Sequence, residues 1–198
     1  MSEFNLNDDQ FQESNSSNVT IFNGGKAGLS PDGVKLRIEK KSADDKPNSP
    51  DFKIIATDAN GGEVNSGVWY PKATGDDERD ARSMQIFGQT LNHLIHTYLG
   101  PDAKAPTGTM EEVTNAVIDK LKEPMENTTV RVFTNYNTLN NPKSYMQLRK
   151  YVPFVELDSV DVANTRLTPK PSEQLERPQP DEQTTPQGAT EAATEADW

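Results

Sequence analysis

Short stretches of this chain alternate apolar with polar residues, which is the pattern of half-buried β-strands. The clearest stretch is 33–41, where Val34, Leu36 and Ile38 alternate with charged side chains. Together with the turn signals between them, the alternating stretches predict strands at residues 18–22, 33–41, 51–57 and 64–70. Four short strands at this spacing predict an antiparallel meander that curls toward a small barrel.

After residue 75 the apolar residues recur at intervals of three and four, which predicts helices. The stretch 76–99 has acidic residues at its start, where the helix dipole favours them, and Gly100 at its end. A shorter stretch, 110–121, repeats the spacing, with Thr109 as its predicted cap and Pro124 as its predicted stop. Two helices between strands make the expected fold class α+β.

The stretch 129–157 contains two further strand candidates, on either side of a polar connector at residues 140–142. In the first candidate, Val130 and Val132 alternate with a cation and an aromatic ring. Strand geometry therefore places the valines on one face, which we expect in the core, and the cation and ring on the other. A face that mixes cations with rings is typical of surfaces that hold a nucleic-acid strand.

The net charge of -11 is concentrated at the two ends of the chain. Residues 1–17 carry four acidic and no basic residues, and residues 158–198 carry nine acidic and three basic ones. The centre keeps a net charge of only -1, so the acidity of the whole chain does not exclude a nucleic-acid ligand. Composition predicts a disordered arm at 1–17 and a disordered acidic tail at 161–198, flanking one domain at 18–160.

No motif in the sequence indicates an enzyme. The chain has 0 Cys, and its two histidines, His93 and His96, lack the carboxylates that would complete a zinc site. P-loop, nucleophile-elbow and dinucleotide-binding patterns are absent from the sequence. No apolar run is long enough to span a membrane, and the N-terminus is unlike a signal peptide. We therefore expect a non-enzymatic cytoplasmic protein that uses no metal or cofactor.

Cations and aromatic rings gather on the predicted strands or at their ends, and each is a candidate contact to single-stranded DNA. Rings stack on bases and cations neutralise phosphates, although outward Lys and Arg are ordinary on any barrel. Lys150 and Tyr151 are neighbours in the sequence, so both point outward only if the strand bulges or bends there, which Pro153 favours. The candidates are Lys35, Arg37, Lys53, Trp69, Arg131, Phe133, Tyr136, Tyr145, Arg149, Lys150 and Tyr151.

The end of the chain adds a resemblance to a known family. The tail finishes in Ala196–Asp197–Trp198, preceded by Glu191 and Glu195. With this acidic, aromatic-ended tail, the chain resembles the single-stranded DNA-binding proteins of bacteria and, more closely, of tailed phages. The resemblance implies an OB-like β-barrel with an inserted helical pair, which coats single-stranded DNA in replication, recombination and repair. It also implies that Glu191, Glu195, Asp197 and Trp198 recruit replication or repair proteins and compete with DNA, in the host cytoplasm if a phage encodes the chain.

A second hypothesis is a phage structural or assembly module that uses the helix pair to form a homo-oligomer. On that hypothesis the ring-bearing face packs against a partner instead of DNA. A DNA-mimicking inhibitor fits poorly, because mimicry needs negative charge on a folded surface and the centre of the chain is nearly neutral.

Overall fold

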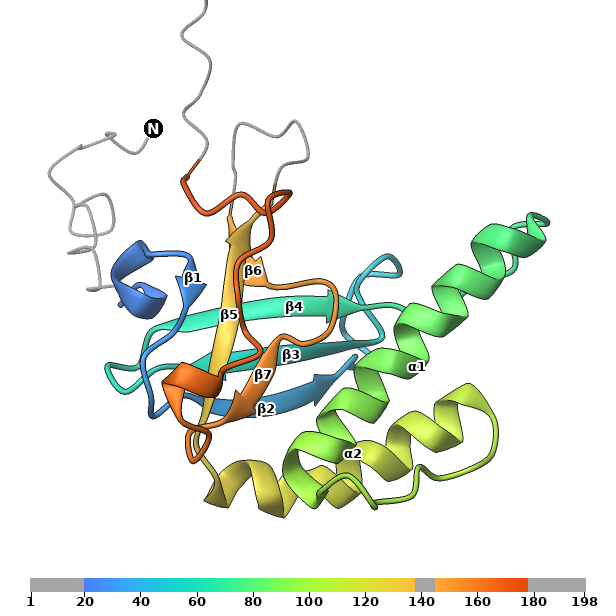
Figure 1. The fold of residues 1–198 in the computed structure, drawn as a ribbon. Coiled ribbons are helices and arrows are strands. Elements are labelled where there is room, and N and C mark those ends of the chain that lie inside the picture. Colours follow the sequence, from blue (N-terminus) through green and yellow to red (C-terminus); the bar gives the residue numbers. More distant parts are fainter. Residues whose placement is uncertain (1–19, 138–144, 178–198) are drawn as a thin grey trace, which may run out of the picture.

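The predicted α+β class is confirmed: two helices lie against two antiparallel sheets (Figure 1). The computed structural model describes residues 20–137 and 145–177. The predicted arm at 1–17, the connector at 140–142 and the end of the tail beyond residue 177 lie outside the described residues.

The first sheet consists of β2 (Lys35–Lys40), β3 (Phe52–Thr57) and β4 (Glu63–Val68), paired antiparallel in that order. Alternation in the sequence predicted these three strands to within a few residues. The apolar half of each alternation, including Leu36 and Val64, forms the buried inner face of the sheet. The polar half therefore forms the outer face, as the period of two requires.

The second sheet is built around β5 (Val130–Tyr136), which pairs antiparallel with every other strand of this sheet. β1 (Gly28–Leu29) lies along one edge of β5. The shorter β6 (Met146–Leu148) and β7 (Val155–Leu157) share the other edge. Because β5 is flanked on both edges, it is a central strand. Six of its seven residues are buried, and the first five, Val130 to Thr134, are buried in succession without alternation.

Among the described residues, one backbone bridge joins the two sheets. The N–H of Val34 donates to the carbonyl of Val130 at 3.2 Å, and the N–H of Val130 donates back at 2.9 Å. On the opposite side β4 lies beside β6, where Ser66 Oγ donates to the carbonyl of Leu148 at 3.2 Å. No ladder connects β4 to β6 in the described residues, so the predicted barrel is not closed there.

Both helices begin within a residue of their predicted starts, and Thr109 is the cap that the sequence predicted. α1 (Asp77–Leu99) starts at Asp76, whose side chain accepts the N–H of Arg79 at 3.0 Å. α2 (Met110–Asn127) starts with a capping box between Thr109 and its glutamate three residues on. The prediction that Pro124 stops α2 was wrong: the helix runs on through it. The residue after the proline, Met125, is buried in the core, and this burial offsets the backbone bond that the proline cannot donate.

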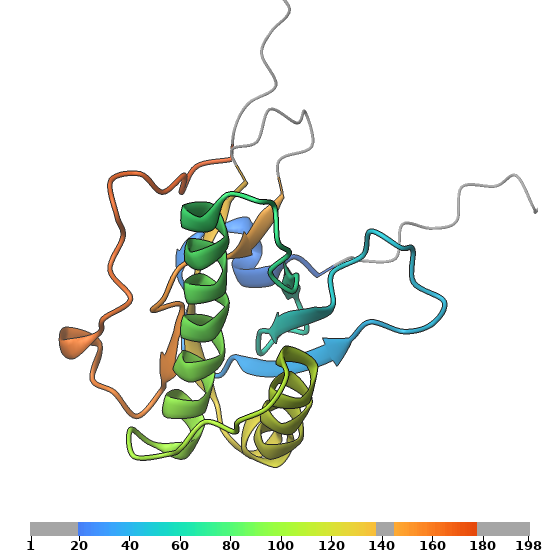
Figure 2. The ribbon, with the colours of Figure 1, turned by 90° about the vertical axis from the view of Figure 1, so that its right-hand side faces the viewer.

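The core lies between the two sheets and under the helices. Figure 2 shows α1 and α2 in front of the strands, where α1 contacts β7 and α2 contacts β2. Each helix contributes the apolar face that its three-and-four spacing predicted. The largest apolar side chains with almost no exposure are Phe22, Phe52, Leu94, Ile95, Val117, Leu121, Val130 and Leu148.

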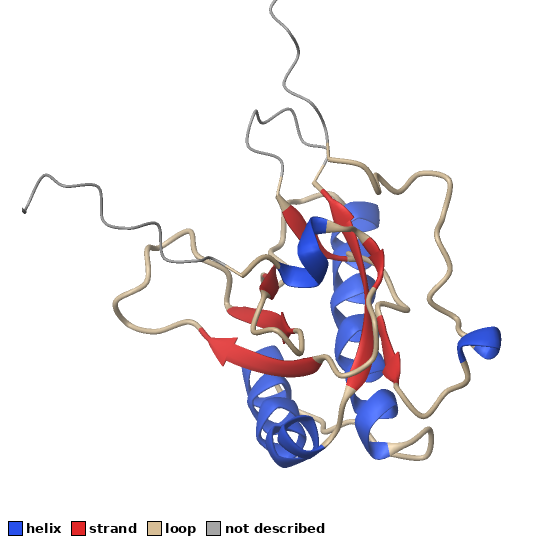
Figure 3. Ribbon diagram, turned by 90° about the vertical axis from the view of Figure 1, so that its left-hand side faces the viewer, coloured by secondary structure: helices blue, strands red, loops and turns tan. Residues whose placement is uncertain are grey.

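Two predictions about the ends of the domain were wrong. In the described part of the predicted strand at 18–22, Ile21 makes only an isolated bridge to Glu63, and a 3-10 turn, Phe22–Gly25, begins at the next residue, with positive φ at Asn23 and Gly24 (Figure 3). At the other end the folded unit continues past residue 160. Residues 161–177, which we call the strap, include the 3-10 turn Val162–Asn164 and a fully buried Leu167.

Candidate nucleic-acid interface

Four of the predicted DNA-contacting residues lie together on the first sheet. The register of β2, β3 and β4 places Lys35, Arg37 and Lys53 on its polar outer face. Trp69 follows two residues after Gly67, at the end of β4. We call this surface the outer face. It consists of Lys35, Arg37, Glu39, Lys53, Ile55, Thr57, Glu63, Asn65, Gly67 and Trp69.

Arg37 is held by two carboxylates of the same face. Its guanidinium pairs with Glu63 at 2.7 Å and with Glu39 at 3.0 Å. The hydrogen bond with Glu63 raises the pKa of Arg37 and lowers the pKa of Glu63. The charge of Arg37 is thus already matched, and an incoming phosphate would compete with the two glutamates for it.

The two lysines of the outer face differ from Arg37. Lys35 donates its Nζ to the backbone carbonyl of Glu126, at 2.5 Å, and forms no ion pair with another described residue. Lys53 is half-buried and forms no hydrogen bond or ion pair with another described residue. Its charge nevertheless acts on Asp45, whose pKa is lowered by a hydrogen bond from the Ser42 backbone and by the charge of Lys53. Neither ammonium of the face is thus held in an ion pair with a described residue.

Trp69 is 53% exposed, and its Nε1 donates weakly to the carbonyl of Asn48 at 3.5 Å. Its ring packs beside Gly67 and Pro50. Neither neighbour was predicted from the sequence. The available signal was the isolated glycine inside a strand at position 67, because such a glycine often marks a place where another group closely approaches the backbone.

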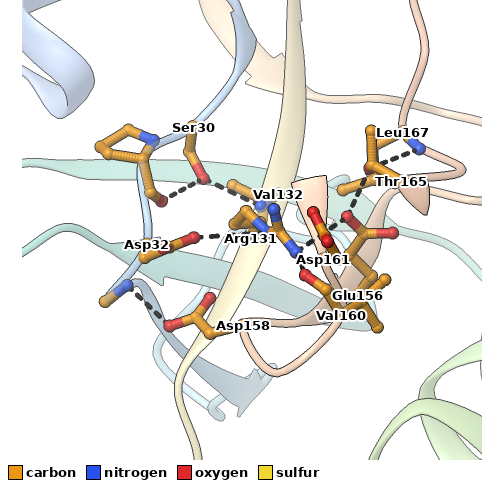
Figure 4. A network of polar contacts seen from close by, with 12 residues as sticks. Ser30, Asp32, Arg131, Val132, Glu156, Asp158, Val160, Asp161, Thr165 and Leu167 are labelled. Atoms are coloured by element: carbon orange, nitrogen blue, oxygen red, sulfur yellow. Dashed lines mark hydrogen bonds and ion pairs between the residues drawn. The ribbon is translucent and has the colours of Figure 1, made fainter. Parts of the chain in front are cut away.

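Arg131 is buried, so the prediction that it lies on an open face was wrong. Its side chain is 2% exposed and pairs with Asp32 at 3.3 Å and with Glu156 at 3.5 Å, while it also donates to the carbonyl of Val160 (Figure 4). Because the next residue along the chain, Val132, is also buried, both faces of β5 are covered here. Arg131 therefore joins β5 to the segment just before the strap and is almost entirely shielded from solvent.

The rings predicted beside it, Phe133 and Tyr136, are buried as well. Tyr136 donates its hydroxyl to the carbonyl of Gly25 at 2.7 Å. The guanidinium of Arg149 stacks on the ring of Phe133 with its Cζ 3.8 Å from the ring centroid. An open binding surface formed by these side chains is thus not present, because the strap, predicted to be disordered, covers them.

The remaining candidates of the second sheet are exposed at its loops. Tyr145 precedes β6, and Lys150 and Tyr151 follow it. β6 ends at Leu148, so a bend allows both neighbours to point outward, as the position of Pro153 predicted. The Nζ of Lys150 lies 5.6 Å from the centroid of the Tyr151 ring.

The histidines do not form a metal site. His93 Nε2 accepts the backbone N–H groups of Phe154 and Val155 at 3.3 and 3.4 Å. Burial, together with the positive charge of Arg166, lowers the pKa of His93 to about 4. His96 is exposed, and the described part of the chain holds no cluster of three potential metal ligands.

Comparisons with known proteins identify no relative of this chain: no family model, curated protein or solved structure matches it. Within the described residues, neither helix is apolar and long enough for a membrane span. The predicted tail residues Glu191, Glu195, Asp197 and Trp198 lie outside the described residues.

Proposed function

We propose that this protein binds single-stranded DNA on the outer face of the β2–β3–β4 sheet. The observation that carries the proposal is that Lys35, Arg37, Lys53 and the exposed Trp69 share one surface, although they come from two strands and the residue just after a third. Stacking of a base on such a ring contributes about 1–3 kcal/mol, and the lysines add a salt-dependent term from phosphate neutralisation.

The order of the strands supports an OB-like reading of the fold. β2, β3 and β4 form a meander, the helices follow, and β5 returns to pair with the segment just before β2. β6 then comes to lie beside β4. An OB-fold is a partly open Greek-key barrel whose second and third strands hold oligonucleotides. With the segment 28–40 taken as the first strand, β3 and β4 occupy those two positions.

A fluorescence anisotropy titration with a labelled oligothymidylate tests the proposal. We expect binding whose affinity falls as salt rises, because phosphate contacts release counterions. Trp69→Ala is expected to weaken binding about tenfold or more. Lys53→Glu is expected to weaken it and to reduce the salt slope by about one. No binding, or an affinity that salt does not change, would refute the proposal.

Matched controls separate the outer face from general effects of charge and apolar area. Lys122→Glu makes the same charge change on the exposed side of α2, and Leu99→Ala removes an exposed apolar side chain at the end of α1. Neither residue belongs to the outer face, so both variants are expected to bind like the parent. Equal losses in the controls and in the outer-face variants would assign the binding to another surface.

We also propose that the acidic end of the chain, with Glu191, Glu195, Asp197 and Trp198, competes with DNA and recruits replication or repair proteins. The negative charge of this end would repel phosphates and attract the lysines of the outer face. Ending the chain after Arg177 removes it and keeps every described contact. At low salt the shortened chain is expected to bind DNA more tightly than the full chain. At high salt this difference in affinity is expected to shrink, because salt screens the repulsion between the acidic end and the phosphates. Unchanged affinity at low salt would refute the competition.

A second candidate function, a phage structural or assembly module, rests on the first turns of α1. These turns extend beyond the sheets in Figure 1, and Met84 on them is 48% exposed. An oligomer detected by light scattering that Met84→Glu dissociates would favour this function. A monomer that binds the oligonucleotide would exclude it.

A further inference from the structure

Gly67 leaves a gap in the outer face that two neighbouring rings fill. A Cβ at this position would lie 2.9 Å from Cη2 of Trp69 and 3.0 Å from Cβ and Cγ of Pro50. Real Cβ atoms essentially never show contacts this short, so no other residue fits without moving the rings. The indole and the pyrrolidine thus occupy the space above β4 where a side chain would stand.

This packing restrains the indole of Trp69 at the surface. The Cη2 edge of the ring system lies over Gly67 next to Pro50, and about half of the residue, 53%, remains exposed. The bond from Nε1 to the carbonyl of Asn48 adds a further restraint. A ring that is restrained before binding loses little conformational entropy when a base stacks on it.

A lysine lies directly beside this ring. In the register of β3 and β4, Lys53 is the partner of Gly67 and shares its face. Across that pair the Cβ positions of an antiparallel ladder are about 5 Å apart, so the lysine stem rises next to the gap that the indole fills. The restrained ring and the stem of Lys53 are therefore neighbours on the outer face.

We propose that Gly67 is a positioning residue for a one-nucleotide site: the base stacks on the open side of Trp69, and its phosphate meets the ammonium of Lys53. The proposal rests on the proposed function and adds the class of ligand to it. An unpaired nucleotide fits this site, because a base in a duplex is already stacked on both of its faces. Gly67 acts through Trp69 and does not touch the DNA itself.

The test uses the full-length chain with Trp198→Phe, which leaves Trp69 as the single tryptophan of the protein. In this parent, an unlabelled oligothymidylate is expected to quench the Trp69 emission, because the base covers the ring. Gly67→Val is expected to abolish the quenching and to weaken binding about tenfold, since it displaces the ring. The salt slope is expected to stay unchanged, because Lys53 remains in place.

The outcomes distinguish this proposal from the proposed function. A parent that binds no oligonucleotide refutes the proposed function. A parent that binds without quenching, or a Gly67→Val variant that binds and quenches like the parent, overturns the one-nucleotide site alone. If urea unfolding shows that Gly67→Val is not folded, Pro50→Ala is the deciding variant. It removes the pyrrolidine ring that lies next to the indole and leaves Gly67 unchanged. Weaker quenching and affinity in Pro50→Ala support the site, and unchanged values overturn it.

Discussion

The guanidinium of Arg149 and the carboxylate of Glu173 form a buried ion pair, with Nε and Oε1 separated by 2.6 Å and side chains that are 2% and 8% exposed. The same guanidinium donates to the backbone carbonyls of Pro153 and Thr168 and stacks on Phe133. The pair fastens the strap to β5 and β6, so the strap is part of the folded unit.

Removing one partner of this pair is expected to be costly. Glu173→Ala leaves Arg149 buried without its counter-charge, and loss of one partner of a buried pair costs about 3–5 kcal/mol of unfolding free energy. Equilibrium urea denaturation measures the loss. Glu176→Ala makes the same change at an exposed residue of the strap and is expected to stay within about 0.5 kcal/mol of the parent. Equal stability of the two variants would contradict the structure.

The position of a C-terminal truncation is expected to matter. Ending the chain after Asn164 removes the buried Leu167 and the ion-pair partner Glu173, so this variant is expected to lose at least as much stability as Glu173→Ala. Ending it after Arg177 keeps both contacts. Urea unfolding of the two truncated chains compares them directly. A chain ending at 164 that is as stable as one ending at 177 would show that the strap does not contribute to the fold.

His93 makes stability depend on pH. Its pKa is about 4 in the folded protein against an ordinary value of 6.5, so the unfolded chain takes up the proton first as the pH falls. The stabilisation is fully present above pH 6.5 and is lost as the pH falls from 6.5 toward 4. The shift corresponds to about 3 kcal/mol of unfolding free energy. Urea unfolding at a series of pH values between 4 and 7 measures it.

Variants assign that pH dependence to one residue. His93→Gln keeps an acceptor for the backbone N–H groups of Phe154 and Val155 and cannot take up a proton in this range. The variant is expected to lose most of the slope between pH 6.5 and 4. The exposed His96, changed to Gln, is expected to retain the slope. An unchanged slope in His93→Gln would exclude His93 as its source.

Two glycines are expected to respond to alanine in opposite directions. A Cβ at Gly62 would lie 2.6 Å from the backbone nitrogen of Phe22, so Gly62→Ala forces two backbones apart, at a cost of about 1–3 kcal/mol. Gly88, inside α1, has open space at the same position, and Gly88→Ala is expected to stabilise by about 0.5–1 kcal/mol. Thermal or urea unfolding measures the change in unfolding free energy for each variant. A Gly62→Ala variant that is more stable than the parent would contradict the close approach of the Phe22 backbone to Gly62.

Local patterns predicted most of the elements. The alternation around Leu36, the acidic start of the stretch 76–99 and the capping residue Thr109 located β2, α1 and α2, because each signal lies within a few residues of the element that it specifies. The same local logic failed at Pro124, where the buried Met125 keeps the helix intact one turn longer. It also failed in the described part of 18–22, where a 3-10 turn begins at Phe22 and the ring of Phe22 fills the core.

The sequence by itself determined which residues on β2, β3 and β4 face outward, because a half-buried strand carries its orientation in its period of two. Only the tertiary structure decided which cations and rings remain accessible. Arg131, Phe133 and Arg149 fit the pattern of an open face, but segments from elsewhere in the chain enclose them. The strap binds Arg149 where it stacks on Phe133, and Asp32, Glu156 and Val160 hold Arg131. Burial is a non-local property, since it depends on segments that fold back from elsewhere. The same reason explains why the packing of Trp69 on Gly67 and Pro50 appears only in the folded chain.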